Sequence, residues 1–321
     1  MRCAAAFALA VSASLLVLGP ASAQRSTTSS APPLVAPAPG QPAPAATAPA
    51  ATPAPARAAS GKCDNPNALG TTRTVEIDTS GGPGFGFEHF RQHDFLRDKE
   101  VVLTFDDGPW PSTTAVVKAL GDECVKATFF MIGKHATYYP EIVRQVAQGG
   151  HSVGSHTWSH KDLSTFKNID EAKSEIEKAV SAIKWALADQ GQEQPFFRFP
   201  ALRHPPELVT YLGERNIAIF STDMDSFDFK LRKPDQVVKS VMTRLAKHGK
   251  GMVLMHDFQQ ATSQAVPQLL AELKAGGYKI VHMKARSTVT SLPQYDEELK
   301  KDAKLPTVSQ RPTSSVVRDA D

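Results

Sequence analysis

The chain has 321 residues and a formal net charge of +3, from 36 basic and 33 acidic residues. This length allows one substantial domain with appendages, so the size of the chain does not limit a buried core. Nearly balanced charges, with no basic stripe interleaved with aromatic residues, argue against a nucleic-acid partner.

Residues 1–23 have the pattern of a signal peptide. Arg2 is followed by an apolar run over residues 3–18 and by Ala-Ser-Ala at positions 21–23, a small-residue cleavage site. The apolar run is shorter than the about 20 residues of a membrane-spanning helix, which favours cleavage over an uncleaved membrane anchor. No later stretch could span a bilayer. We therefore expect an exported protein, periplasmic or extracellular at the cell envelope, with no membrane span after signal cleavage.

The composition divides the rest of the chain. Residues 24–61 are dominated by Ala, Pro, Ser and Thr, which predicts a disordered, extended linker. Residues 293–321 are polar and lack sustained periodicity, which predicts a flexible tail. Between them we expect a catalytic domain at 100–292, preceded by an N-terminal extension of that domain at 62–99.

Cleavage of the signal peptide would remove Cys3 and leave two cysteines in the mature chain. In an oxidising compartment Cys63 and Cys124 could form one disulfide, and the alternative is two free thiols. A zinc site is disfavoured because neither cysteine has a second Cys or His at the short spacing of structural zinc sites.

From Glu100 onward, short apolar runs alternate with longer amphipathic segments, a rhythm typical of a parallel sheet covered by helices. The predicted strands are 101–105, 127–131, 151–155, 196–200, 217–222, 251–256 and 278–283. The predicted helices are 112–121, 140–148, 170–188, 206–214, 235–247 and 264–275. This α/β pattern fits a distorted (β/α)7 barrel, with a doubly wound open sheet as the alternative.

Two adjacent carboxylates, Asp106 and Asp107, follow the first predicted strand and precede Gly108 and Pro109. Adjacent side chains at a strand end point in different directions. One carboxylate can then bind a metal while its neighbour stays free as a base, the division of labour of a metal hydrolase. The alternative interpretation is structural, because these four residue types in sequence are also common in ordinary turns.

Two imidazoles, His156 and His160, follow the third predicted strand at a spacing that places both on one face if the segment is helical. Together with Asp107 they form a possible metal site of two imidazoles and one carboxylate, which leaves positions open for water and substrate. Two surface histidines are the alternative interpretation.

Further polar residues lie where later strands end, and the carboxyl ends of parallel strands share one face of a barrel or an open sheet. We therefore expect these residues to meet the carboxylates and imidazoles in one site. They are Arg198, Asp225, Asp228 and His256.

These segments resemble the motifs of the polysaccharide deacetylases with a NodB-type domain, also called carbohydrate esterase family four. The resemblance covers about residues 100–283, in which 104–109 (TFDDGP) is similar to the first motif and 156–160 (HTWSH) to the second. Arg198 opens the third motif. Residues 225–229 (DSFDF) are similar to the fourth motif, and 254–257 (LMHD) to the fifth.

The resemblance implies a role for each residue. Asp106 would be the catalytic base and His256 the catalytic acid, with Arg198 orienting the base. Asp107 and the two histidines of the second motif would bind one divalent metal ion, for which we expect Zn²⁺, with Co²⁺ or another divalent cation as alternatives. Leu254 would line an acetyl pocket. From its charge, Asp228 should favour the protonated form of the histidine acid, and Asp225 could share a charge-tuning task.

Two positions depart from the family pattern. Ala201 stands where the family usually has a tyrosine whose backbone N–H helps to hold the oxyanion, and Phe229 replaces the usual tryptophan of the fourth motif. Both positions belong to the substrate groove rather than to the metal site, so the departures bear on the identity of the substrate more than on catalysis.

The expected function is removal of N-acetyl groups from an amino-sugar polymer such as peptidoglycan, a chitin-like polymer or an exopolysaccharide, by a monomer. The alternatives are an O-acetyl esterase or small-amide hydrolase of the same fold, and a non-catalytic envelope protein that binds carbohydrate.

Overall fold

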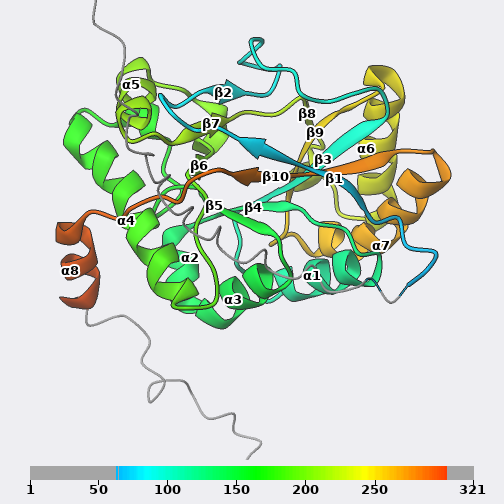
Figure 1. Cartoon of the computed structure of the whole chain (residues 1–321), viewed down its shortest axis with the longest axis horizontal. Coiled ribbons are helices and arrows are strands. Elements are labelled where there is room, and N and C mark those ends of the chain that lie inside the picture. The colour runs from blue at the N-terminus through cyan, green and yellow to red at the C-terminus, as the bar shows by residue number, and fades with distance from the viewer. Residues whose placement is uncertain (1–62, 64, 302–321) are drawn as a thin grey trace, which may run out of the picture. The chain divides into compact units, whose positions relative to one another are not determined.

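The computed structural model describes Cys63 and residues 65–301 of the chain (Figure 1). The predicted signal peptide, the predicted linker and the end of the predicted tail lie outside the described residues.

Seven short strands form an incomplete ring in which every pairing is parallel. In order, β3 (Glu100–Asp106), β4 (Thr128–Met131), β5 (Ser152–Ser155), β6 (Phe196–Phe197) and β7 (Ala218–Phe220) pair with one another. The next strand, β8 (Met224–Asp225), pairs with β9 (Gly251–His256), and β9 returns to pair with β3. Among the described strands β7 and β8 do not pair with each other, so the barrel is distorted at that point.

Pairing of β9 with β3 excludes the doubly wound open sheet. The last predicted strand, 278–283, is not part of the ring. It corresponds to β10 (Lys279–Ala285), which pairs with only two residues of β3 and otherwise with β1 (Thr71–Ile77). The ring reaches seven strands through the two-residue strand β8, which was not predicted.

The helices lie around the outside of the strands (Figure 1). Their bounds are α1 (Thr113–Asp122), α2 (Gly133–Tyr138), α3 (Pro140–Gln148), α4 (Ile169–Leu187), α5 (Pro206–Glu214), α6 (Pro234–His248), α7 (Gln260–Ala275) and α8 (Pro293–Lys301). Six of them match predicted helices within a few residues, and α2 and α8 were not predicted.

Alternation along β3 explains how one strand serves both the core and the site. Val101, Leu103 and Phe105 pack in the core that also contains buried residues of α1 and α7. Val102 packs in a second core with aromatic residues of β4, β6 and β7. Because side chains alternate along a strand, Thr104 and Asp106 follow Val102 on the face turned toward the inside of the ring. A strand that is buried on both faces has a continuous apolar sequence. For this reason the sequence predicted β3 clearly.

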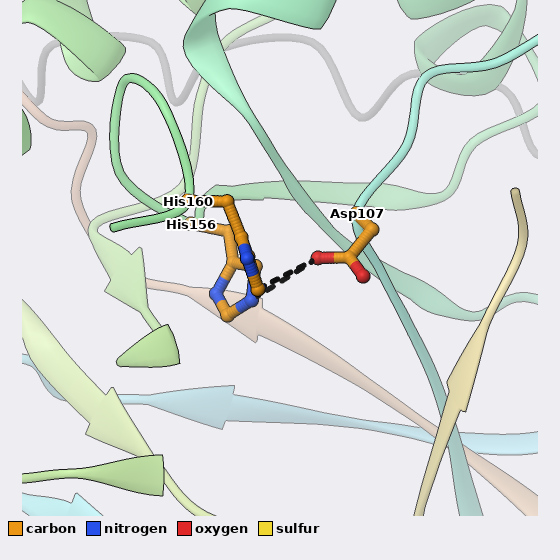
Figure 2. A group of neighbouring side chains, drawn as sticks. All are labelled: Asp107, His156 and His160. Carbon is orange, nitrogen blue, oxygen red and sulfur yellow. Dashed lines mark ion pairs between the residues drawn. The ribbon is translucent and has the colours of Figure 1, made fainter. Parts of the chain in front are cut away.

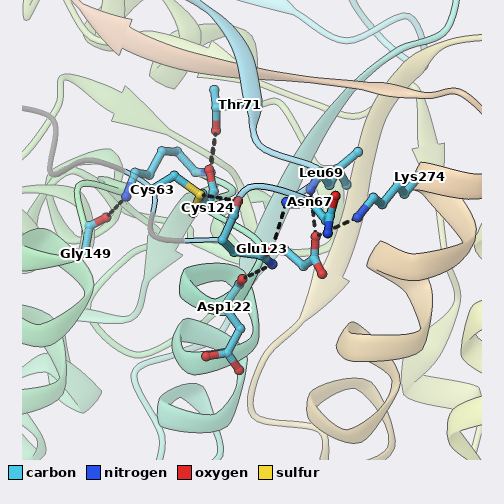
Figure 3. The surroundings of a disulfide bond; sticks show 11 residues. Cys63, Asn67, Leu69, Thr71, Asp122, Glu123, Cys124, Gly149 and Lys274 are labelled. Atoms are coloured by element: carbon cyan, nitrogen blue, oxygen red, sulfur yellow. Dashed lines mark hydrogen bonds and ion pairs between the residues drawn. A yellow bond between two sulfur atoms is a disulfide. The ribbon is translucent and has the colours of Figure 1, made fainter.

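The residues before β3 are tied to the barrel. The structure joins Cys63 to Cys124 in a disulfide, with their Cα atoms 5.7 Å apart, so the predicted bond is confirmed (Figure 3). Nearby, the backbone N–H of Leu69 donates to the Glu123 carboxylate at 2.7 Å, and the Thr71 hydroxyl donates to the carbonyl of Cys124 at 3.4 Å. This segment is therefore anchored beside the end of α1.

The two-residue strand β2 (Gly84–Phe85) pairs with β7 next to the break in the ring. The loop after it is held by backbone contacts. The N–H of Phe87 donates to the Asp223 carboxylate at 2.7 Å, and the N–H of Glu88 donates to the carbonyl of Thr222 at 3.0 Å. Gly86 has φ +98°, and a Cβ there would lie 2.6 Å from the backbone nitrogen of Thr222, so only glycine fits this close approach.

The expectation of a flexible tail from residue 293 is wrong for its first nine residues, which form α8 against α4. Leu299 is buried, and Lys178 and Lys184 of α4 form ion pairs with Glu298 and Asp296. These contacts come from a distant part of the chain, so the polar local sequence did not reveal the helix.

Candidate active site

The candidate residues gather at the carboxyl ends of the ring strands, in a cleft of about 540 Å³. The register of β3 and β9 sets Asp106 directly beside His256. Eight of the ten residues of the predicted site line this cleft, and the other two, Arg198 and Asp228, are hydrogen-bonded to the lining residues Asp106 and His256. Its lining residues are Glu88, His89, Asp106, Asp107, His156, His160, Phe199, Ala201, Leu202, Asp225, Phe229, Leu254, His256 and Phe258.

Asp107, His156 and His160 converge on one point (Figure 2). One ligand atom from each lies within 4.8 Å of the others. Oδ1 of Asp107 is 3.5 Å from Nε2 of His156 and 3.1 Å from Nε2 of His160. That oxygen is buried and has no hydrogen-bond partner among the described residues. A buried carboxylate oxygen left without a donor is costly, and a cation would satisfy it, so the donor set fits a divalent metal ion.

The two histidines do not reach this point from a helix. Residues 156–160 form a loop in which Thr157 has φ +69° and His160 has φ +59°. The loop is held by α2, because the N–H of Gly133 donates to the carbonyl of Thr157 at 2.9 Å. The conditional expectation of a helical segment was therefore wrong, although the two imidazoles meet on the same carboxylate.

A hydrogen bond sets the orientation of the His156 ring. Nδ1 of His156 lies 2.6 Å from the carbonyl oxygen of Arg198, so Nδ1 carries the proton and Nε2 presents a lone pair toward Asp107. Burial lowers the pKa of His156, which favours the neutral imidazole that a metal requires. The backbone of Asp107 is also fixed, because its carbonyl accepts a hydrogen bond from Nδ1 of His135 at 2.8 Å.

Asp106 forms a buried ion pair with Arg198. The guanidinium Nη1 donates to Oδ1 of Asp106 at 2.7 Å and to the hydroxyl of Thr104 at 2.8 Å. Both charged side chains are almost fully buried. Oδ2 of Asp106 accepts no hydrogen bond within the described residues and lies 3.9 Å from Nε2 of His156, a candidate metal ligand.

The guanidinium of Arg198 is held from several sides. Its other nitrogens donate to the carbonyl oxygens of Phe220 at 3.3 Å and Ser221 at 2.7 Å. Its central carbon lies 4.3 Å from the ring centre of Phe130, a cation–π contact. Arginine supplies enough donors in a fixed plane for all these contacts, and lysine does not.

On the neighbouring strand β9, His256 pairs with the buried Asp228. Nδ1 of His256 lies 2.6 Å from Oδ1 of Asp228, whose Oδ2 accepts from the His256 backbone N–H at 2.7 Å and from the Thr262 hydroxyl at 2.6 Å. Burial alone would lower the pKa of His256. The hydrogen bond and negative charge of Asp228, with smaller contributions from Asp107 and Asp106, outweigh burial and raise that pKa to about 9.

The remaining predicted residues line the same cleft. Ala201 has φ +53°, and its backbone N–H makes no hydrogen bond to another described residue. Leu254 is buried in the cleft wall, whereas Phe229 is exposed and meets His256 edge-on at 5.8 Å between ring centres. Burial raises the pKa of Asp225, which also lines the cleft and accepts a hydrogen bond from the N–H of Phe227.

Several lining residues were not predicted. Glu88 and His89 reach the cleft from the loop after β2, and Phe258 follows the histidine of the fifth motif by two positions. Of these residues, only Phe258 could have been found from the local sequence, because it lies just beyond the carboxyl end of β9. Nothing in the residues around Glu88 indicates that β2 pairs with β7.

No helix within the described part of the chain is long and apolar enough to cross a membrane.

Comparisons with known proteins agree with the family resemblance of the sequence. The model of the family described as polysaccharide deacetylase matches residues 94–218. The chain is 31% identical over 206 residues to a peptidoglycan-N-acetylglucosamine deacetylase of Bacillus cereus, covering 63% of this chain and 70% of that protein. It is 34% identical over 188 residues to the peptidoglycan-N-acetylglucosamine deacetylase PgdA of Listeria monocytogenes, covering 57% of this chain. That match spans only 38% of the Listeria protein.

Among solved structures, the peptidoglycan deacetylase Bd3279 of Bdellovibrio bacteriovorus is similar, with a TM-score of 0.60 and 32% identity. The similarity covers 67% of this chain and 59% of that one.

Proposed function

Because this chain belongs to the polysaccharide deacetylase family, we propose that it is an exported, metal-dependent hydrolase that removes N-acetyl groups from an amino-sugar polymer. One observation carries the proposal. A possible metal site, a carboxylate held by an arginine and a histidine held by a carboxylate all face one cleft. The names of the relatives make peptidoglycan the first polymer to test.

Asp107, His156 and His160 would hold the metal ion, for which we propose Zn²⁺. When bound, a divalent cation supplies positive charge that polarises an amide carbonyl and makes water more acidic. Support for the site comes from the buried Oδ1 of Asp107, which has no hydrogen-bond partner among the described residues, and from the fixed tautomer of His156.

Asp106 would act as the general base. Its Oδ1 is occupied by the guanidinium of Arg198, which leaves Oδ2 to accept a proton from the attacking water. The ion pair also orients the carboxylate, so we assign Arg198 as a positioning residue.

Ala201 would stabilise the negative charge that develops on the carbonyl oxygen. Its backbone N–H is unused within the described residues and lies in a cleft-lining loop, and one such donor is typically worth about 3 kcal/mol in the transition state. Leu254 would contact the methyl of the acetyl group and Phe229 the sugar ring, since both side chains line the cleft.

His256 would donate a proton from Nε2 to the departing amine. Its Nδ1 is taken by Asp228, and the raised pKa keeps the imidazole protonated at neutral pH. Amide hydrolysis requires both a base and an acid, and here a carboxylate and a protonated imidazole line one cleft.

The test is acetate release from peptidoglycan, chitin oligomers and acetylated xylan, with and without prior metal removal. We expect release from the N-acetylated substrates and loss of that release when the metal is removed. Release from acetylated xylan alone would favour the O-acetyl esterase alternative, which the Ala201 and Phe229 departures suggest. A purified protein without bound metal or acetate release would favour the non-catalytic alternative.

A further inference from the structure

The two proposed histidine ligands are oriented in different ways. The ring of His156 is fixed through Nδ1, which donates to the carbonyl of Arg198. Nδ1 of His160 makes no hydrogen bond within the described residues, and its Nε2 is directed only toward the carboxylate of Asp107 (Figure 2). A histidine that binds a metal is usually held through its second ring nitrogen. His160 therefore depends on the backbone of its loop for its position.

The backbone of this loop has a conformation that is unfavourable by itself. Thr157 has φ +69° and His160 has φ +59°, angles that are uncommon for residues other than glycine and least favourable for a β-branched side chain. Such angles persist only where the surrounding structure determines them. Part of that support comes from α2, because the N–H of Lys134 donates to the carbonyl of Trp158 at 2.9 Å.

Glu175 of α4 supplies further support for the same loop. Its carboxylate accepts hydrogen bonds from the backbone N–H of Ser159 at 2.9 Å and from the Ser159 hydroxyl at 2.8 Å. Its backbone carbonyl accepts from the N–H of Trp158 at 2.7 Å. Glu175 is 7% exposed, and its ion pair with Lys161 is long, at 3.9 Å. One residue thus binds the N–H groups of the two residues directly before His160.

A second buried carboxylate of α4, Glu177, has different partners. It accepts from the hydroxyl of Tyr211 at 2.7 Å and from two guanidinium nitrogens of Arg215 at 2.8 Å and 3.0 Å. Neither Glu177 nor Glu175 lines the cleft, so neither side chain is placed to touch a substrate there. The two glutamates share a helix, their burial and three hydrogen bonds to the side-chain carboxylate or its residue, but only Glu175 contacts the loop of the proposed metal ligands.

We propose that Glu175 is a positioning residue for the proposed metal site. It fixes the backbone of residues 158–160 and so directs Nε2 of His160 toward Oδ1 of Asp107. The inference rests on the proposed function and extends it to a residue outside the cleft. Loss of such an outer partner typically weakens metal binding about 10- to 100-fold. Because the His156 ring has its own anchor, the disturbance should fall on His160.

Glu175→Gln tests the proposal against Glu177→Gln as the matched control. Glutamine keeps one acceptor oxygen and replaces the other by an NH₂ group, which cannot accept a hydrogen bond. We expect Glu175→Gln to raise the Kd for Zn²⁺ about 10- to 100-fold, measured by competition with a chelator after the metal has been removed. Glu177→Gln should lower the free energy of unfolding and leave the Kd for Zn²⁺ unchanged.

A second measurement needs no metal. In the metal-free protein, NMR relaxation of the Cε1–H bonds reports the mobility of each histidine ring on the ps–ns timescale. Glu175→Gln should lower the order parameter of the His160 ring and leave that of His156 unchanged, because the Arg198 carbonyl still holds the His156 ring.

The outcomes separate this inference from the proposed function. Equal zinc affinity of the unmodified protein and Glu175→Gln, equal weakening by Glu177→Gln, or an unchanged His160 ring would each overturn the positioning role. An unmodified protein that binds no zinc would overturn the proposed metal site, and the mobility of the metal-free His160 ring would then decide whether Glu175 positions it.

Discussion

The carbonyl oxygen of Arg198 accepts a hydrogen bond from Nδ1 of His156 at 2.6 Å. The side chain of the same arginine holds Asp106 through Nη1. One residue therefore orients a proposed metal ligand with its backbone and the proposed base with its guanidinium. A shift of the loop at Arg198 would disturb both halves of the site together.

Replacing either proposed histidine ligand should remove the metal, because a site that loses one of three protein donors holds a catalytic cation weakly. We expect His156→Ala and His160→Ala to purify with far less than one metal ion per chain, measured by elemental analysis. His160 is the cleaner test because it is 42% exposed, so its loss should leave the fold intact. Stoichiometric metal in both variants would reject the ligand assignment.

Asp106→Asn should preserve the fold and the metal while it removes the base. The amide oxygen of asparagine can still accept from Arg198, but the buried guanidinium loses its counter-charge, so the melting temperature should fall while the protein stays folded. Turnover should fall by about 10² to 10⁴. Circular dichroism and metal content serve as controls, and near-normal turnover would show that another group takes the proton.

Arg198→Met should destabilise the protein as well as impair turnover. It leaves the Asp106 carboxylate buried without its partner, which typically costs about 3–5 kcal/mol. The free energy of unfolding, obtained from denaturant titration, measures this cost. In the double variant with Asp106→Asn the loss should be smaller, because no unpaired charge remains; equal losses would mean that the cost arises from packing alone.

Asp228→Asn should lower the pKa of His256 from about 9, because it removes the negative charge beside Nδ1. The basic limb of the kcat/KM profile should then move to lower pH, and an NMR titration of the His256 ring should move with it. The pKa of His256 is higher in the folded than in the unfolded state, and this determines how stability depends on pH. Protonation of His256 stabilises the fold fully below its unfolded pKa of about 6.5, and this stabilisation is lost as the pH rises through about 9.

His256→Ala should affect amides more than esters. An amine needs a proton to depart, whereas the alkoxide of an activated ester hardly does, so the loss on N-acetyl substrates should approach about 10² to 10⁴. Comparing acetate release from N-acetylglucosamine oligomers with hydrolysis of an aryl acetate measures the difference. Unchanged turnover on the oligomers would remove His256 from its role as acid.

Breaking the disulfide should lower stability. The bond closes a segment with a sequence separation of 61, for which the chain-entropy estimate is about 4 kcal/mol. Cys63→Ser should therefore lower the melting temperature, while thiol titration of the denatured, unreduced mature protein should find no free thiol. Two free thiols per chain would contradict the bond.

Six of the seven ring strands were predictable because burial on both faces leaves continuous apolar runs such as 101–105 in the sequence. The short strands β2 and β8 were not predicted. They contain two residues each and depend on pairing with distant strands. The edge strand β1 mixes exposed and half-buried positions along Thr71–Ile77, so it carries no strong apolar signal.

The candidate site was predictable to the extent that its residues follow ring strands. Asp106 and His256 end the neighbouring strands β3 and β9, and the rule for parallel strand ends brought them together. Three features depend on backbone angles and long-range contacts that the local sequence does not encode. They are the loop conformation at His156 and His160, the approach of Glu88 and the position of Trp110 beside the proposed metal ligands.

Pairing of β3 with β9 has a consequence for how the proposed substrate preference could change. The ladder runs from Val101 to Asp106 without interruption and sets Asp106 opposite His256. The backbone positions of the proposed proton acceptor and donor are thus held by hydrogen-bonded main chain, in strands about 4.8 Å apart. Glu88, which lines the cleft, and Trp110, which lines an adjoining hollow, lie in contrast on separate loops. Loop exchange between relatives could therefore alter polymer preference while the proton-transfer geometry is inherited unchanged.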